Sequence, residues 1–137
     1  MNLTRRLKDC GQSLWLDNIT RALLDEGTLA GYIEEYSITG LTSNPSIFDA
    51  AIRDEHAYDA GIRTKTKAGL RGEALFIELA LEDLRRAADL FRATFEATGK
   101  VDGWVSMEVS PLLASDTQGS IEAARRIHGA ARRDNLL

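Results

Sequence analysis

Short strand-like runs alternate with longer helical patterns along this chain of 137 residues. The strand-like runs cover residues 13–17, 37–42 and 103–110, and a fourth begins at residues 135–137. Between them, apolar residues recur at steps of three and four, which is the spacing of an amphipathic helix. This order of elements predicts an α/β fold with a parallel sheet, either doubly wound or closed into a barrel.

The helical patterns differ in strength. The clearest one places its apolar side chains on a single face of a helix that ends near Gly99. These side chains are Leu81, Leu84, Ala88, Phe91 and Phe95. We also expect a helix over residues 28–36, a buried one over residues 73–81 and a weaker one over residues 121–131.

The two faces of the third predicted strand differ in polarity. From residue 105 to residue 110, valine or methionine alternates with serine or glutamate, and Leu14 and Leu16 form a similar apolar face on the first strand. A strand in an open parallel sheet is buried on both faces and is nearly all apolar. The alternation therefore favours the wall of a barrel whose interior opens on a site, although an exposed antiparallel strand has the same pattern.

Composition and charge narrow the classes of partner. Hydrophobic residues make up 44% of the chain and charged residues 28%, as in one globular domain with its own core. The net charge of −4 argues against nucleic acid or an anionic membrane as the main partner. Cys10 is the single cysteine, and there is no signal-peptide or membrane-length apolar run, so we expect a cytoplasmic protein.

Polar residues stand near the carboxyl ends of three predicted strands. They are Asp17, the pair Thr42 and Asn44, and Glu108. Ligands bind at this edge in α/β barrels and in open parallel sheets alike, so we expect these side chains to converge on one small ligand. Two carboxylates in different surroundings can divide an acid role and a base role between them.

Structural explanations compete with this functional one. Asp17 followed by Asn18 is a suitable helix cap, and Asn44 followed by Pro45 is an ordinary helix start. Glu108 is harder to explain in this way, because a carboxylate in an otherwise apolar strand needs a partner or a water-filled cavity.

Several other polar or aromatic residues are expected to have structural roles. His56 and His128 lie in charged helical stretches without a second metal ligand at useful spacing, so we expect both on the surface. Residues 63–67 (RTKTK) suit a solvated helix face or loop better than a phosphate site. Trp15 and Trp104 are expected to pack rather than to bind a sugar.

Three segments of the chain resemble the transaldolase family. GLTSNPSIF at residues 40–48 is similar to the signature of that family around its second barrel strand. WLDNI at residues 15–19 and GWVSMEVSPLLASDT at residues 103–117 resemble its first and third strands, in the same order and at the same spacing. The resemblance is to the N-terminal part of a transaldolase, of the bacterial type that is sometimes fused to a glucose-6-phosphate isomerase.

This resemblance implies a transferase with a TIM, or (β/α)8, barrel in the pentose phosphate pathway. Residues 1–137 would be the N-terminal portion of a single barrel domain, covering about its first three to four βα units. A dihydroxyacetone unit would move from sedoheptulose 7-phosphate to glyceraldehyde 3-phosphate, giving erythrose 4-phosphate and fructose 6-phosphate. The reaction uses a lysine Schiff base and needs no metal or organic cofactor.

By the same resemblance, each polar residue of the predicted site has a role. Asp17 resembles the acid/base that handles the proton of the C4 hydroxyl during carbon–carbon cleavage. Glu108 resembles the carboxylate that acts through a water in the formation and dehydration of the carbinolamine. Asn44 resembles the amide that binds the dihydroxyacetone hydroxyls, with Thr42 beside it.

The Schiff-base lysine of the family lies on the fourth strand, in a run similar to IKIPGT. None of the four lysines of this chain, Lys8, Lys65, Lys67 and Lys100, falls in such a run. We therefore expect a fragment that is inactive alone, with sugar phosphates and either a missing C-terminal half or a second copy as partners. The alternatives are a catalytically dead half-barrel that serves as an interaction module or is a degenerate gene product, and a sugar-phosphate aldolase of the same superfamily.

Overall fold

A computed structural model of the chain describes residues 2–43, 45–54 and 56–137. Its sheet contains β1 (Trp15–Leu16), β2 (Gly40–Ser43) and β3 (Trp104–Met107), all parallel and in the order β1-β2-β3. Val105 of β3 also forms a parallel bridge with Leu136, so the end of the chain begins to pair beside β3, as the sequence predicts. Among the described residues, neighbours in the sheet therefore follow one another in the sequence, without the reversal of strand order of a doubly wound sheet.

All three strands are shorter than the sequence predicts. Regular pairing of β1 stops at Leu16 and that of β3 stops at Met107. Asp17 and Glu108 therefore lie in the segments that follow the strands and not within them. The reason is that a ladder needs a paired neighbour, and β1 pairs with β2 through only two residues, Trp15 and Leu16.

Helices connect the strands. The first part of the chain contains α1 (Leu3–Asp9), α2 (Arg21–Asp25) and α3 (Thr28–Tyr36). Between β2 and β3 lie α4 (Pro45–Asp54), the 3₁₀ turn η1 (His56–Tyr58), α5 (Asp59–Lys67) and α6 (Gly72–Ala97). After β3 come the 3₁₀ turn η2 (Pro111–Leu113) and α7 (Thr117–Ala131). The helix predicted over residues 28–36 is confirmed as α3.

The two helices predicted over residues 73–81 and from Leu81 onward are one continuous helix, α6, of 26 residues. Two separate helices were therefore the wrong interpretation. The segment in question, EALFIELAL, contains no glycine or proline that would end a helix, and its ordinary helix formers continue directly into the amphipathic part.

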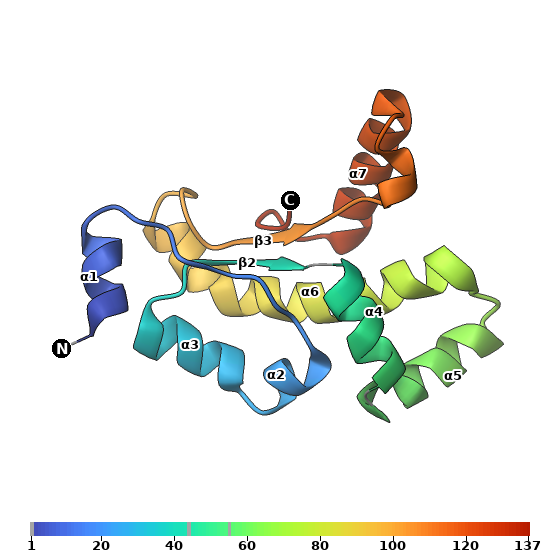
Figure 1. Cartoon of the computed structure of the whole chain (residues 1–137), viewed down its shortest axis with the longest axis horizontal. Helices are drawn as coiled ribbons and strands as arrows, with labels where there is room; N and C mark the ends of the chain where they lie inside the picture. Colours follow the sequence, from blue (N-terminus) through green and yellow to red (C-terminus); the bar gives the residue numbers. More distant parts are fainter. Residues whose placement is uncertain (1, 44, 55) are drawn as a thin grey trace.

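The hydrophobic core lies between α6 and one face of the sheet. Figure 1 shows α6 running alongside β2 and β3, with α2 and α3 beside it and α7 extending away from the sheet. Leu41 of β2 and Val105 of β3 are fully buried, as are Leu84 and Phe91 of α6. Because this cluster is contributed by both the strands and the helices, it fixes which face of the sheet is covered.

Within the described residues, no helix combines the length and the apolar character that crossing a bilayer requires.

Candidate functional site

One face of the sheet is packed against α6. The opposite, uncovered face carries the more polar side chains that strand alternation places there. The register pairs Trp15 with Gly40 and Gly40 with Trp104, and two residues further on it pairs Thr42 with Ser106. Asp17 stands two residues beyond Trp15, in the segment that directly follows β1. The alternation of an apolar and a more polar face is therefore present in the folded chain.

Asp17 and Glu108 lie at the same end of the sheet, since each directly follows a parallel strand. Both residues are exposed, while Thr42 is half-buried. Neither of the two carboxylates has a hydrogen-bond or ion-pair partner among the described residues, so both are free to meet a ligand or water. Asn44, the fourth residue of the predicted site, lies outside the described residues.

Neighbouring polar side chains hold the strands at this end. Ser43 is buried, and its hydroxyl donates a hydrogen bond of 3.1 Å to the carbonyl oxygen of Ser106. Beyond Glu108, the Ser110 side chain caps η2, and the Asp116 side chain caps α7 by accepting from the Gly119 amide at 2.9 Å. The segment that carries Glu108 thus passes directly into two short-range caps, which fix its course toward α7.

Trp15 lies on the uncovered face, one step below Asp17 and Thr42. A Cβ atom at Gly40 would stand 2.5 Å from Cε2 of the Trp15 indole, so the ring rests directly on the backbone of β2. Trp15 is 40% exposed, whereas the Trp104 ring packs edge-on against Phe95 at a centroid distance of 4.9 Å. Both tryptophans pack, as the sequence predicts, and Trp15 also forms a floor beneath the candidate site.

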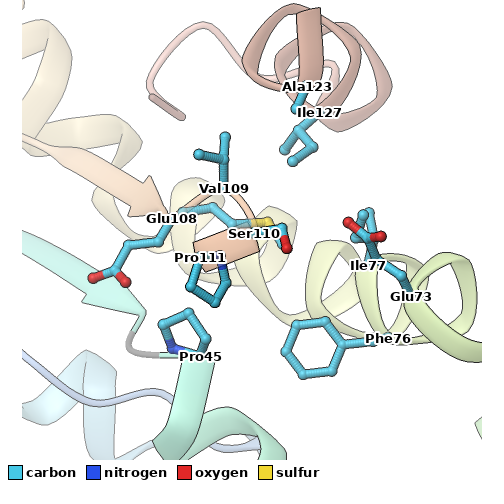
Figure 2. A pocket seen from close by; sticks show the side chains of 11 residues that line it. Pro45, Glu73, Phe76, Ile77, Glu108, Val109, Ser110, Pro111, Ala123 and Ile127 are labelled. Carbon is cyan, nitrogen blue, oxygen red and sulfur yellow. The ribbon is translucent and has the colours of Figure 1, made fainter. Parts of the chain in front are cut away.

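A small cavity of about 110 Å³ lies near the end of β3. Apolar side chains of α6, α7 and the end of β3 line most of it, among them Phe76, Met107 and Ile127, and Glu108 also belongs to its lining. Figure 2 shows the Glu108 carboxylate directed away from Phe76 and from the apolar part of this cavity. The cavity therefore lies mainly between the helices and the end of β3, and Glu108 stands between it and the open polar face.

A buried ionic cluster joins three of the helical segments. The Asp83 side chain of α6 is fully buried; it accepts hydrogen bonds of 2.9 Å from Arg21 Nε and from the Tyr58 hydroxyl. Arg21 also contacts Glu82 at 2.9 Å, and Lys65 contacts Glu82 at 2.8 Å. Sequence reasoning missed this cluster, because an aspartate within the charged stretch EDLRR is typical of a solvated helix face.

The environment of this cluster changes the acidity of its members. Burial raises the pKa of Asp83, against the opposing effect of the Arg21 charge and of the Tyr58 hydrogen bond. Burial and the negative charge of Asp83 raise the pKa of Tyr58, so its hydroxyl remains protonated and able to donate at neutral pH. Burial alone would raise the pKa of Glu82, but the hydrogen bonds from Lys65 and Arg21 lower it.

The remaining polar residues that the sequence singled out lie apart from the polar face. The His56 side chain is almost fully exposed, and His128 is an exposed residue whose Nδ1 lies 2.8 Å from the carbonyl oxygen of Leu136. Residues 63–67 form the end of α5. Among the described side chains, no group of three His, Cys, Asp or Glu residues is placed to hold a metal ion.

The four lysines also lie away from the strand ends. Lys8 is in α1, Lys65 and Lys67 are in α5, and Lys100 follows α6. Lys65 forms an ion pair with Glu82, and the Lys100 ammonium group lies 5.7 Å from the Phe95 ring centroid. None of the four stands at the carboxyl end of a described strand.

Comparison with known proteins identifies the family. The model of the transaldolase/fructose-6-phosphate aldolase family matches residues 14–137. The chain is 40% identical over 137 residues to transaldolase 2 of Nostoc sp. and 42% identical over 137 residues to the transaldolase of Thiobacillus denitrificans. It is 44% identical over 134 residues to the transaldolase of Arthrobacter sp..

These matches cover 98–100% of this chain but only 36–38% of each relative. The chain thus spans little more than a third of the length of the relatives that it matches, and it corresponds to their N-terminal part. With these matches, and with parallel strands in sequential order, the chain belongs to the transaldolase/fructose-6-phosphate aldolase family.

Proposed function

We propose that this chain supplies the first part of a transaldolase active site in the pentose phosphate pathway of the cytoplasm. The reaction moves a dihydroxyacetone unit from sedoheptulose 7-phosphate to glyceraldehyde 3-phosphate, and it releases erythrose 4-phosphate and fructose 6-phosphate. The observation that carries the proposal is the position of Asp17, Thr42 and Glu108 at one end of a parallel sheet, on segments that lie within the family match.

Asp17 is proposed as the acid/base of the carbon–carbon step. It takes the proton of the C4 hydroxyl while the C3–C4 bond breaks, and the electron pair of that bond enters the protonated Schiff base to form an enamine. In the reverse direction, the enamine attacks the acceptor aldehyde and Asp17 returns the proton to the new hydroxyl. Its exposure and its lack of an ion-pair partner among the described residues support this role.

Glu108 and the two residues near β2 are proposed to handle the dihydroxyacetone unit. Glu108 acts through a water molecule, moving protons as the carbinolamine forms and loses water. Asn44 binds the dihydroxyacetone hydroxyls through its amide, and Thr42 contributes to the same substrate binding. Phosphate binding and the Schiff-base lysine are assigned to later strands of the barrel, which this family builds from a longer chain.

The positions of the lysines support a nucleophile outside residues 1–137, because none of the four stands at a described strand end. A full barrel of this type has about 250 residues. The sheet described for this chain leaves the outer edge of β1 without a partner, which supports a need for further strands. The same incomplete barrel is the basis for expecting no activity from the chain alone.

A sugar-phosphate aldolase is the second candidate, because the matching family model includes fructose-6-phosphate aldolases. The two reactions share the Schiff base and the cleavage step, and they differ in whether an acceptor aldehyde is required. Release of free dihydroxyacetone from fructose 6-phosphate without an acceptor would favour the aldolase. All three relatives named above are transaldolases, which favours the transferase.

Borohydride trapping with fructose 6-phosphate tests the proposal. Residues 1–137 alone should give no covalent adduct in a mass spectrum. A chimera that joins these residues to the remaining part of the Nostoc transaldolase 2 should give one adduct per chain, on a lysine of the Nostoc part, and should transfer dihydroxyacetone to glyceraldehyde 3-phosphate.

Two outcomes would contradict the proposal. A stoichiometric adduct on Lys8, Lys65, Lys67 or Lys100 would place the nucleophile in this chain. A folded chimera without activity, beside an active Nostoc parent, would instead support the catalytically dead half-barrel.

A further inference from the structure

The Asp83 side chain joins α6 to two segments, those that contain Arg21 and Tyr58, which are distant from it in the sequence. Its carboxylate, with 0% exposure, lies on α6 and accepts from Arg21 Nε and from the Tyr58 hydroxyl, each at 2.9 Å. Arg21 and Tyr58 also contact each other. The backbone amide of Arg21 donates to the Tyr58 hydroxyl oxygen at 2.9 Å, and the guanidinium lies 4.5 Å from the Tyr58 ring centroid.

Arg21 belongs to the segment that leaves β1 at the candidate site. It is the first residue of α2 and stands four positions after Asp17. The amide hydrogen bond of Arg21 therefore holds the start of α2, to which residues 17–20 are directly joined. Thr20 caps the same helix by accepting from the Leu23 amide at 3.1 Å.

Tyr58 belongs to the segment that leaves β2. That segment contains α4, which begins at Pro45, and reaches Tyr58 in η1. The Phe48 ring of α4 packs edge-on against Tyr58 at 5.8 Å and against Phe76 at 5.4 Å, so it joins α4, η1 and α6 by aromatic contacts. Two segments that each start at the candidate site thus converge on a single carboxylate.

We propose that Asp83 is a positioning residue that, through Arg21 and Tyr58, fixes the two segments leaving β1 and β2 at the site end of the sheet. Asp83 lies on α6 with a fully buried side chain, and the hydrogen bonds and ion pairs that it forms with described residues are those with Arg21, Tyr58 and Arg86. The inference rests on the proposed function only for the catalytic role of Asp17. The joining of the two segments is a separate property that can be measured without any reaction.

A carboxylate suits this position for physical reasons. One acceptor group with two oxygens can bind the guanidinium and the hydroxyl at the same time, and charge-assisted hydrogen bonds are stronger than neutral ones. Arg86 adds a second positive charge, with Nη1 at 4.0 Å from the Asp83 oxygen. Because an unpaired buried carboxylate is costly, Asp83 favours the arrangement in which Arg21 and Tyr58 are both in place.

A nearby pair in the same cluster provides a matched control. Lys65 forms ion pairs with Glu82 at 2.8 Å and with Glu78 at 3.9 Å, and among the described residues no hydrogen bond or ion pair joins it to Asp83 or to the segment that leaves β1. Lys65→Gln therefore removes these two ion pairs next to Asp83 and leaves the hydrogen bonds of Arg21 and Tyr58 to Asp83 intact. Tyr58→Phe removes a single hydroxyl group and with it two hydrogen bonds of that joining.

Amide hydrogen exchange on the 137-residue chain tests the inference, with the Leu23 amide as the reporter and the Ile127 amide of α7 as the internal reference. Tyr58→Phe should raise the exchange rate at Leu23 about fivefold to tenfold relative to Ile127, the effect of losing the one of its two hydrogen bonds that reaches α2. Lys65→Gln should change this ratio less than about twofold.

Trp15 gives a second, spectroscopic readout, because it stands two residues before Asp17. In a Trp104→Phe background it is the single tryptophan, and its quenching by iodide should increase on Tyr58→Phe and stay unchanged on Lys65→Gln. An increase in Leu23 exchange that is no larger than the increase at Ile127 would overturn the inference, as would an equal selective effect of Lys65→Gln.

Asp83→Asn, which keeps the size of the side chain, is examined in the same way if Tyr58→Phe does not fold. If both variants unfold while Lys65→Gln folds, the cluster serves the whole fold and the inference is overturned. Failure of the proposed function would instead appear in the borohydride assay, with the exchange result unaffected.

Discussion

The two faces of the sheet differ in how completely this chain covers them. On the helix face, Leu41 and Val105 are fully buried and Leu136 is 1% exposed. On the opposite face, Trp15 is 40% exposed, and the exposed Asp17 lies in the segment that follows. Side chains on the two faces of the sheet therefore have different surroundings.

This difference separates what stabilises the chain from what would perform chemistry. The helix face takes its stabilisation from apolar burial, to which α6 contributes more core residues than any other element. The polar face contributes little burial and carries the carboxylates, so substitutions there should change activity more than stability. Pairs of variants at neighbouring positions can test this division directly.

The largest expected effect is a loss of activity when Asp17, at the polar face, is substituted. In the chimera, Asp17→Ala should lower kcat by about 10²- to 10⁴-fold, since loss of a general acid/base costs that much. Leu16→Ala, one residue earlier and on the helix face, is the control and should keep kcat within about threefold while lowering stability. Initial-rate measurements would reveal the difference, and turnover by Asp17→Ala close to that of the unsubstituted chimera would remove its acid/base role.

The second largest expected effect is a loss of stability when Leu41, on the helix face, is substituted. Leu41→Ala should lower the free energy of unfolding by about 2–5 kcal/mol, because a fully buried leucine leaves a cavity. Thr42→Ala, the adjacent residue on the polar face, should cost less than about 1 kcal/mol. Urea unfolding followed by circular dichroism measures both values, and equal losses would show that the faces do not differ.

The smallest effect concerns the contact between Trp15 and Gly40. Gly40→Ala should lower the free energy of unfolding by about 1–3 kcal/mol, because its Cβ would meet the indole ring at 2.5 Å. Removing the ring should relieve the clash, so Gly40→Ala should cost less in a Trp15→Ala background. A double-mutant cycle, measured by urea unfolding, gives this coupling energy. If the two losses of unfolding free energy are strictly additive, the indole ring moves aside without an energetic cost.

Much of the fold could be predicted from the periodicity of apolar residues. The steps of three and four gave α3 over residues 28–36, and the alternation at residues 105–110 indicated which side chains share a face. Strand ends were less predictable, because they depend on whether a neighbouring strand offers backbone partners at that position. The continuity of α6 was missed, since two overlapping apolar patterns suggested two helices.

The candidate site was predictable in part for a similar reason. Asp17 and Glu108 are polar residues next to apolar strand residues, so the local pattern marks them. No local pattern of this kind distinguishes Asp83 in the sequence. Its burial results from Arg21 and Tyr58, which are 62 and 25 positions away in the chain, and a single-sequence pattern has no access to that juxtaposition.

The buried Asp83 also constrains the order in which the chain acquires its structure. The apolar side of α6 can pack on the strands with contacts that form independently of one another. Because a buried carboxylate without partners is costly, desolvation of Asp83 favours its simultaneous pairing with Arg21 and Tyr58, both of which lie N-terminal to it in the chain. We therefore expect the start of α2 and η1 to become ordered together as they pack on α6.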